Sequence, residues 1–413
     1  MKFRDWLRMS KLGTKFEVPE LRFPEFINYP KWENKPFSKL FEIGSGKDHK
    51  HLADGDIPVY GSGGYMRSVN DYLYEGKSAC IGRKGTINKP MFLSGKFWTV
   101  DTLFYTHSFK NCIPEFIYLL FQNIDWLKLN EAGGVPSLSK VIINKIEVVI
   151  PKEEEQQKIV DCIYSVDDLI TVNTKKLESL KLHKKGLMQK LFPAEGENKP
   201  DFRFPEFSME ANWKKEKLHN LVDLLSGHAF KSEYFSTTGK KMVTPKNFTK
   251  NGFASFSEDN TKYTSEDFNE RYICREGDLL LLLTDLTPSC ELLGRPMLLT
   301  PSDGEVLLNQ RIAKVILKGN INSNFLKYFF LSNSFRKRII NTATGSTVRH
   351  TSNKIVLSTE LLLPNLSEQN KIAACLLSID ELIRSQADKI ETLKEYKKGL
   401  MQQLFPEMKE SIA

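Results

Sequence analysis

The clearest hydrophobic pattern of the chain lies in two segments, where apolar residues recur at alternating steps of four and three. In the first segment these positions are Ile159, Ile163, Val166, Ile170, Asn173, Leu177, Leu180, Lys184, Leu187 and Leu191. In the second they are Ile372, Leu376, Ile379, Ile383, Gln386, Ile390, Leu393, Lys397, Leu400 and Leu404. Such spacing is a heptad seam, so the pattern predicts two long coiled-coil helices.

Prolines mark the ends of both predicted helices. Pro151 and Pro364 stand just before them, and Pro193 and Pro406 follow the Leu-Phe pairs that end them. A helix over about 153–191 would be roughly 58 Å long. Because one helix cannot bury so narrow a stripe alone, we expect the two arms to pack on each other, most simply antiparallel.

Two polar residues, Asn173 and Gln386, interrupt the seams at matching positions. In an antiparallel pair they would lie near the middle, in adjacent layers. A buried polar residue in a seam fixes the register at some loss of stability. The alternative is a partly hydrated stretch where neither residue fixes anything, and the pattern leaves both interpretations open.

The chain is a tandem duplication. The string PELRFPEF at 19–26 returns as PDFRFPEF at 200–207, and each copy is followed by a tryptophan, Trp32 or Trp213. The arm at 158–193 returns at 371–406 with 20 of 36 positions identical. We expect the phenylalanines of both copies of this string, Phe23, Phe26, Phe204 and Phe207, to anchor the heads to the arms. Constant arms with divergent heads suggest shared docking but different ligands, although an old duplication that merely drifted is the alternative.

The predicted fold class is α+β. Two mixed α/β heads, at 1–151 and 194–364, are joined by two long antiparallel coiled-coil helices related by a pseudo-two-fold, at 152–193 and at 365–413 with the tail. Each head contains an apolar-aromatic helix candidate, Phe116–Leu127 or Phe325–Ile339, followed by a glycine-containing turn.

Composition suits globular domains: 413 residues, of which 40% are hydrophobic. No run of eighteen apolar residues exists, and the start, MKFRDWLRMSKLG, lacks the apolar region of a signal peptide. The six cysteines form no C-x-x-C pair, which argues against a zinc site or a disulfide framework. We therefore expect a cytoplasmic protein that neither contacts membranes nor binds metal.

The net charge of +8 is not evenly distributed. Both arms carry as many basic as acidic residues, seven of each at 153–193 and six of each at 365–406. The excess positive charge therefore lies in the heads. This distribution suits contact of the heads with DNA phosphates and contact of the arms with protein.

The chain resembles the specificity subunits of type I restriction-modification systems over nearly its whole length. The strongest elements are EQQKI (155–159) and EQNKI (368–372) with the endings KKGLMQKLFP and KKGLMQQLFP. Head motifs that look like the target-recognition domains of this family are GDIPVYGSGG, CIGRKGTINKPMF, FWTVDTLFY, SGHAFKSEYF, GDLLLLLTD and LNQRIAKV. Each motif alone is weak, but their order and the duplication make the combination specific.

The resemblance implies that each head recognises one part of a bipartite double-stranded DNA target, with two unlike half-sites around an unread spacer. It implies that the arms set the distance between the parts and dock methyltransferase subunits, and that a restriction subunit joins through that core. S-adenosylmethionine, ATP and Mg²⁺ would belong to those partners, and this chain would bind no cofactor. The resemblance gives no role to residues 1–18.

Catalytic motifs do not appear. No (D/N)PP(Y/F/W) string is present, and EIGSGKDHKH (42–51) fails as a phosphate loop because Phe41 replaces the leading glycine and Asp48 the Ser/Thr. Glu33-x-Lys35 has the spacing of a nuclease motif, but the other repeat does not keep it. We predict a non-catalytic subunit.

Candidate DNA-binding residues are those that can reach a groove or a phosphate from a loop. In the first head these are Lys47, Lys50, Tyr60, Tyr65, Arg67, Arg83, Lys84 and Thr86. In the second head they are Lys231, Lys246, Asn247, Arg295, Arg349, His350 and Lys354. The basic run at 336–338 is interpreted instead as the C-terminal face of a helix.

Two other functions remain open on the sequence alone. A stand-alone DNA-binding regulator on the same scaffold would bind DNA tightly and sequence-specifically without partners. A coiled-coil interaction module would show no salt-dependent affinity for DNA in any assembly.

Overall fold

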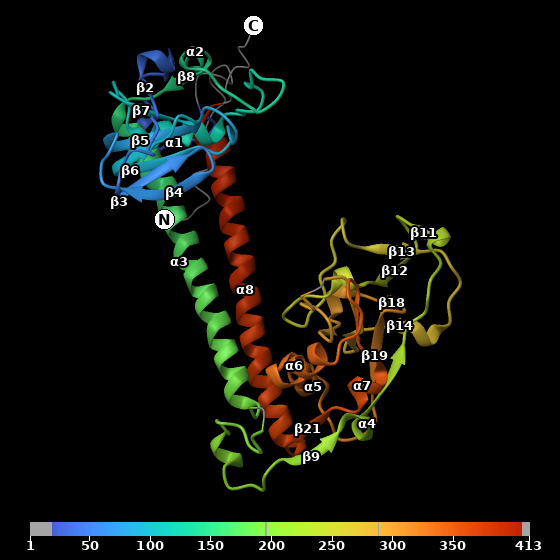
Figure 1. Ribbon diagram of the computed structural model, residues 1–413. Helices are drawn as coiled ribbons and strands as arrows, with labels where there is room; N and C mark the ends of the chain where they lie inside the picture. Colours follow the sequence, from blue (N-terminus) through green and yellow to red (C-terminus); the bar gives the residue numbers. More distant parts are fainter. Residues whose placement is uncertain (1–18, 195, 288, 407–413) are drawn as a thin grey trace. The chain divides into compact units, whose positions relative to one another are not determined.

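A computed structural model describes residues 19–194, 196–287 and 289–406 (Figure 1). Residues 1–18, which include the start predicted to lack the apolar region of a signal peptide, lie outside that description. The chain divides into two compact units: the first comprises Met1–Thr174 with Asp388–Ala413, and the second comprises Lys175–Ala387. This grouping differs from the four predicted segments because each unit takes one end of both long helices.

The head of the first unit is built on a six-stranded sheet. Its strand order is β2-β7-β5-β6-β3-β4, with antiparallel neighbours except for the parallel pair β3 and β6. These strands are β2 Glu42–Ser45, β3 Asp54–Gly61, β4 Gly64–Val69, β5 Tyr74–Gly82, β6 Met91–Thr99 and β7 Leu103–His107. The remaining elements are β1 Glu33–Pro36, which pairs with β8 Glu147–Ile150, and the helices α1 Pro114–Asn123 and α2 Lys140–Lys145.

The second head has a four-stranded sheet, β10-β19-β15-β17, a five-stranded sheet, β11-β13-β12-β18-β14, and the pairs β16-β20 and β21-β9. Its strands are β9 Lys214–Lys217, β10 Val222–Ser226, β11 Phe235–Ser236, β12 Lys240–Val243, β13 Lys262–Thr264, β14 Ile273–Cys274, β15 Leu279–Leu282, β16 Thr284–Asp285, β17 Pro296–Leu298, β18 Val306–Leu308, β19 Ile312–Leu317, β20 Arg349–His350 and β21 Glu360–Leu363. Its helices are α4 Leu218–Leu221, α5 Ser323–Leu331, α6 Asn333–Asn341 and α7 Asn353–Leu357.

The two long helices predicted from the heptads are present. Helix α3 spans Glu153–Leu191 and helix α8 spans Leu366–Leu404. In the first unit, Ile163 near the start of α3 shares one core with Leu404 at the end of α8. In the second unit, Leu191 at the end of α3 shares a core with Leu376 near the start of α8. Within each unit the start of one arm therefore packs beside the end of the other.

The arms do not bury their stripes only against each other. Ile163 and Leu376 lie in separate cores, and each core includes aromatic residues of the adjoining head, such as Phe116 and Phe325. The ring of Phe116 packs on that of Phe405, with centroids 5.3 Å apart, and Phe325 stacks on Phe192 at 5.3 Å. Each head is thus fixed to helix ends from both arms.

The two polar seam residues are both buried, with 7% of Asn173 and 7% of Gln386 exposed. The Asn173 side-chain amide donates to the Leu169 carbonyl at 2.6 Å. Burial contradicts the alternative in which they occupy a hydrated stretch. Their placement in adjacent layers stays a prediction.

The repeated sequence motifs meet at the junction of head and arm. In the first unit the Arg22 guanidinium donates to both carboxylate oxygens of Glu155 at 2.8 Å, and the Trp32 indole N–H donates to the same carboxylate at 3.2 Å. In the second unit Arg203 and Trp213 make the same contacts to Glu368.

The predicted packing role of two repeat phenylalanines is also confirmed. Lys158 of α3 lies over the ring of Phe23, 5.8 Å from its centroid, and Lys371 of α8 lies over Phe204 at 5.7 Å. The glutamines that follow the junction glutamates hold the N-terminal ends of α1 and α5: the side-chain oxygens of Gln156 and Gln369 accept from the backbone N–H of Ile113 and Asn322 respectively. These contacts explain the positions that both copies share.

Both aromatic helix candidates were wrong in their extent, and Phe116–Leu127 is a shorter helix, α1, that ends at Asn123. Phe325–Ile339 is not one helix but α5 and α6, separated at Ser332, whose hydroxyl accepts from the Phe335 N–H and caps α6. The basic run at 336–338 lies on α6 as expected, with Lys337 and Arg338 exposed, but its first residue does not belong to that exposed face. Arg336 is only 8% exposed and donates to the carbonyls of Cys290 and Leu293, so it is a structural residue.

Across residues 19–194, 196–287 and 289–406, no helix is both long enough and apolar enough to cross a bilayer.

Candidate nucleic-acid interface

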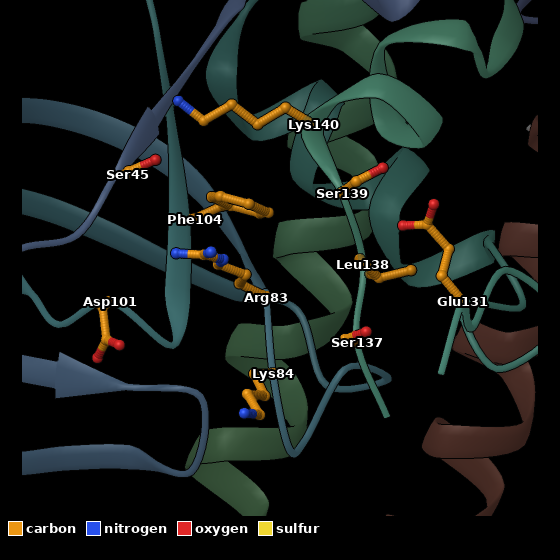
Figure 2. A pocket seen from close by; sticks show the side chains of 10 residues that line it. All are labelled: Ser45, Arg83, Lys84, Asp101, Phe104, Glu131, Ser137, Leu138, Ser139 and Lys140. Carbon is orange, nitrogen blue, oxygen red and sulfur yellow. The ribbon is translucent and has the colours of Figure 1, made fainter. Parts of the chain in front are cut away.

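The first head carries two neighbouring cavities, both of which contain predicted DNA-binding residues. The Arg83 pocket, of about 580 Å³, is shown in Figure 2 and is lined by Ser45, Arg83, Lys84, Asp101, Phe104, Glu131, Ser137, Leu138, Ser139 and Lys140. The Tyr65 pocket, of about 790 Å³, is lined by Asp48, His49, Lys50, Gly61, Ser62, Gly63, Gly64, Tyr65, Met66, Val100, Asp101 and Thr102. Asp101 belongs to both, so the two cavities adjoin.

The Tyr65 pocket collects residues from three segments, at 48–50, 61–66 and 100–102. One is the tight β3–β4 hairpin, where Gly61 pairs with Gly64, and Gly64 needs its glycine because its φ is +114°. Tyr65 is 62% exposed, and its ring meets that of Tyr60 edge-on at 6.1 Å. Lys50 is exposed on the facing loop.

Lys47 is also exposed, and its backbone is fixed. Its N–H donates to the Thr99 carbonyl at 2.8 Å, and its own carbonyl accepts from the Trp98 indole at 2.9 Å. The preceding Gly46 has the Val100 carbonyl oxygen 2.0 Å from where a Cβ would be, so this close approach requires glycine. Lys47 therefore extends from a rigid backbone.

Arg67 is already engaged within the chain. Its guanidinium donates to Asp54 at 2.7 Å across the β3–β4 hairpin. Contact with DNA would compete with this pair.

Arg83 and Lys84 lie where the chain leaves β5. The Arg83 N–H donates to the Thr102 carbonyl at 2.8 Å, and the Arg83 carbonyl accepts from the Leu138 N–H at 2.9 Å. The backbone of Lys84 forms an isolated antiparallel β-bridge with Ser137. Both neighbours of Lys84 in the motif, Arg83 and Gly85, are exposed. Thr86 is half-buried, and its carbonyl lies against Gly82.

The sequence interpretation missed Phe104 and Lys140. The Phe104 ring lies between Arg83, 5.9 Å from its centroid, and Lys140, at 5.8 Å, and Lys140 donates to the Ile43 carbonyl at 2.6 Å (Figure 2). Phe104 appeared only as part of a family-like motif, and Lys140 follows the helix cap Ser139. These residues are far apart in sequence, so no local pattern could have joined them to Arg83.

In the second head, Arg349 and His350 form β20, which pairs with β16. His350 is exposed, and its Nδ1 lies 3.1 Å from the Thr284 hydroxyl. Arg349 is half-buried and donates to the Gly345 carbonyl and the Cys290 sulfur. Lys354 is exposed on α7.

The other predicted residues of the second head are dispersed. Lys231 and Lys246 are exposed, and Lys231 lies 3.9 Å from Glu233. Arg295 donates to the backbone carbonyls of Glu291 and Lys250, and burial lowers its pKa, against the opposing effect of Glu291.

The prediction that Asn247 contacts DNA needs correction. Asn247 is fully buried: its side-chain oxygen accepts from the backbone N–H and the hydroxyl of Thr244, and its amide donates to the side-chain oxygen of Asn260. A polar side chain whose hydrogen bonds are all satisfied inside the fold is structural.

The two heads share one backbone framework around these sites. The Leu283 N–H donates to the Arg311 carbonyl and the Thr351 N–H to the Leu283 carbonyl, which repeats the contacts of Arg83 in the first head. Ser352 caps α7 as Ser139 caps α2. Lys84 pairs with Ser137 in the first head where Thr284 pairs with His350 in the second. The predicted residues Arg83 and Lys84 therefore lie on one strand of this pairing, whereas Arg349 and His350 lie on the other strand.

No group of three or more His, Cys, Asp or Glu side chains suitable for a metal occurs within the described ranges. Glu33 instead forms an ion pair with Lys35 at 2.6 Å.

Comparison with known proteins identifies the family. A model described as the type I restriction modification DNA specificity domain matches twice, at residues 29–182 and 210–395. The MjaVIII type I restriction enzyme specificity subunit of Methanocaldococcus jannaschii is 28% identical over 351 residues, covering 81% of this chain and 77% of that protein. The EcoAI specificity subunit of Escherichia coli is 30% identical over 214 residues, covering 50% of this chain and 34% of that one.

A solved structure supports the same fold. The S subunit of a type I restriction-modification system from M. genitalium superposes with a TM-score of 0.60 at 14% identity, covering 95% of this chain and all of that one. The relatives are named as specificity subunits, which are the non-catalytic members of such complexes, in agreement with the sequence interpretation. The duplicated match over most of its length shows that this chain belongs to the family of type I restriction-modification specificity subunits.

Proposed function

We propose that this chain reads a bipartite, asymmetric double-stranded DNA target, with one half-site bound by each head. The observation that carries the proposal is that one backbone framework presents different side chains in the two heads. Where the first head has Arg83, the second has Leu283 on equivalent backbone hydrogen bonds. Arg83 is exposed whereas Leu283 is buried in the core of its head, so the same framework leaves a cation at the surface of the first head alone, which suits two unlike half-sites.

Charge supports DNA as the ligand of the heads. The arms are neutral and the heads carry the excess of basic residues. Lys47, Lys50 and Lys84 are exposed in the first head, and Lys231, Lys246 and Lys354 in the second. Cations of this kind release counterions from DNA, so we expect affinity to fall steeply as salt rises.

We propose that the arms dock methyltransferase subunits and that a restriction subunit joins through this core. Leu169 and Leu382 occupy the same position in the two copies of the arm, and they are 51% and 55% exposed. Large apolar side chains left on a neutral helix surface at matching positions suit two copies of one protein partner. S-adenosylmethionine, ATP and Mg²⁺ would be bound by those partners.

We further propose that the arms form an antiparallel coiled coil with pseudo-two-fold symmetry, which sets the length of the unread spacer. Reciprocal ion pairs support this arrangement. Lys184 of α3 pairs with Asp380 of α8 at 2.5 Å, and the matching Lys397 of α8 pairs with Asp167 of α3 at 2.7 Å.

Methylation mapping tests the proposal. Genomic DNA from the host is compared with DNA from a strain lacking this gene. We expect one bipartite methylated motif to disappear when the gene is deleted, and an unchanged methylome would contradict the proposal.

Two alternatives give different results in binding assays. A stand-alone regulator would bind one DNA sequence tightly as the purified chain, without changing the methylome. A coiled-coil interaction module would show no salt-dependent DNA affinity, whether alone or with partners.

A further inference from the structure

We propose that the Arg83 pocket reads base edges in the major groove of the first half-site, and that Arg83 donates to N7 and O6 of a guanine there. The inference rests on the proposed function, since it assigns one residue and one base within the target. The lining of this pocket comes from β2, the residues that follow β5, the β6–β7 loop with the start of β7, and the segment that leads into α2.

Arg83 is prepared for a planar, bidentate partner. Its backbone is fixed on both sides by hydrogen bonds to Thr102 and Leu138. Its side chain is exposed, and its guanidinium makes no hydrogen bond or ion pair with any other described residue. Figure 2 shows it beside the Phe104 ring, which limits its orientations. The planar fork of this guanidinium matches the two acceptors that guanine presents in the major groove.

The mixture of charges favours base edges over backbone phosphate. The lining contains Lys84 and Lys140 as well as Arg83, but also the carboxylates of Asp101 and Glu131. Carboxylates repel phosphate oxygens, whereas they accept hydrogen bonds from the amino group of cytosine. A pocket holding both donors and acceptors is therefore suited to a guanine–cytosine pair.

The second head shows that the framework does not require arginine at this position. Leu283 occupies the position of Arg83 on the same backbone hydrogen bonds. Counting along the equivalent strand from Arg311, Ala313 takes the place of Phe104, and counting from the cap Ser352, Asn353 takes the place of Lys140. Arg83, Phe104 and Lys140 are thus all replaced in the second head. This is expected if the three residues bind the ligand of the first head alone.

The test uses the full chain assembled with its methyltransferase subunits and a library of random DNA duplexes. Wild-type protein first defines both half-sites. Arg83→Lys and Arg83→Leu are then compared with it, the first keeping the charge without the planar fork and the second removing both. We expect discrimination for one guanine of one half-site to fall by about 5- to 150-fold, the range for one bidentate contact. Preferences in the other half-site should not change.

Lys89→Ala provides the matched control, because Lys89 is an exposed cation of the same head outside the pocket. It should leave every base preference intact. If Arg83→Lys keeps full discrimination at all positions, or if Arg83→Leu weakens all sequences equally and reduces the salt dependence, Arg83 contacts phosphate or nothing and the inference is overturned. If wild-type protein itself selects no sequence, the proposed function fails instead.

Discussion

At the scale of single residues, the glutamates of the two EQ motifs, Glu155 and Glu368, hold the head–arm junctions together through hydrogen bonds. Glu155 is 1% exposed and receives hydrogen bonds from Arg22 and Trp32. Glu368 is also 1% exposed and receives them from Arg203 and Trp213. A buried carboxylate is tolerated only while its partners remain, so both junctions depend on their arginines.

Replacing Arg22 by alanine should destabilise the first unit strongly. The change leaves the Glu155 carboxylate buried without its cationic partner, and such losses are about 3–5 kcal/mol. Denaturant unfolding of the full chain measures the effect. Lys181→Ala, which removes an exposed pair with Glu178, is the control and should change the unfolding free energy by about 0.5 kcal/mol or less. Equal effects of the two changes would contradict the structural role of the junction.

Lys327 should make stability depend on pH. It is fully buried beside Asp380, Lys184 and Arg384, and burial lowers its pKa from the ordinary 10.5 to about 7, against the opposing effect of Asp380. Between pH 7 and 10.5 the unfolded chain therefore holds a proton that the folded chain lacks. The contribution of Lys327 to the free energy of unfolding therefore rises with pH through that window. Below the window this contribution does not depend on pH.

Unfolding free energies of wild type and Lys327→Met, compared from pH 7 to 10, isolate this effect. Wild type should gain stability relative to the variant by at most about 1.4 kcal/mol per pH unit. A difference that stays constant across the window would show that Lys327 is charged throughout.

Burial decides which of the residues chosen from sequence can reach a ligand. Lys47 and Arg83 were chosen as exposed cations between glycines or turns, and both are exposed. Asn247 has the same polar character in sequence, yet its hydrogen bonds close a buried turn. Phe104 and Lys140 were missed because only the folded chain brings them to Arg83.

At the scale of elements, the arms were predictable because heptad spacing is a property of the local sequence, and both helices begin and end where their prolines indicated. The break between α5 and α6 was not, because apolar residues continue through it. There the cap of Ser332 decides the boundary. The mixed sheets could be assigned only as a class, since their pairings join residues far apart in the chain.

Matching positions of the two arms should differ in their importance. Asp380 is 5% exposed and binds Lys184, Lys327 and the Tyr328 hydroxyl, whereas Asp167 pairs with Lys397 and its side chain is 42% exposed. Below pH 7, where Lys327 is charged, Asp380→Ala leaves this buried cation and the half-buried Lys184 without their counterion, so we expect a loss of about 3–5 kcal/mol there. Asp167→Ala should lower stability by about 1 kcal/mol or less.

Denaturant unfolding of the two variants makes this comparison within one protein. Because both changes remove the same groups from equivalent positions, any difference reports the surroundings. Similar losses would mean that the buried cluster around Asp380 adds nothing to the second unit.

At the scale of the whole molecule, the duplication separates what is constant from what varies. The junctions of heads and arms keep the same residues and the same hydrogen bonds, while the loops around Arg83 and Leu283 keep only their backbone contacts. This division lets one framework carry two surfaces. It also means that sequence repetition identifies the framework, whereas under the proposed function the target bases would be read by the side chains that do not repeat.

The proposed role of the arms in setting the spacer leads to a prediction about length. One heptad is inserted into each arm, between Thr174 and Lys175 and between Ala387 and Asp388, so that both seams keep their register. Seven helical residues add about 10.5 Å, which corresponds to about three base pairs at 3.4 Å each. Methylation mapping should then find the same two half-sites around a spacer about three base pairs longer.

The complex that contains the extended chain should also methylate its target more weakly. A heptad returns the seam to the same helix face, whereas three base pairs turn the duplex by roughly a third of a turn, so the arms or the DNA must twist to engage both half-sites. Inserting a heptad into one arm alone puts the seams out of register and should abolish methylation. A double insertion that retained the original spacer would show that something other than arm length sets the distance between half-sites, and the arms would then serve only to dock the partner subunits.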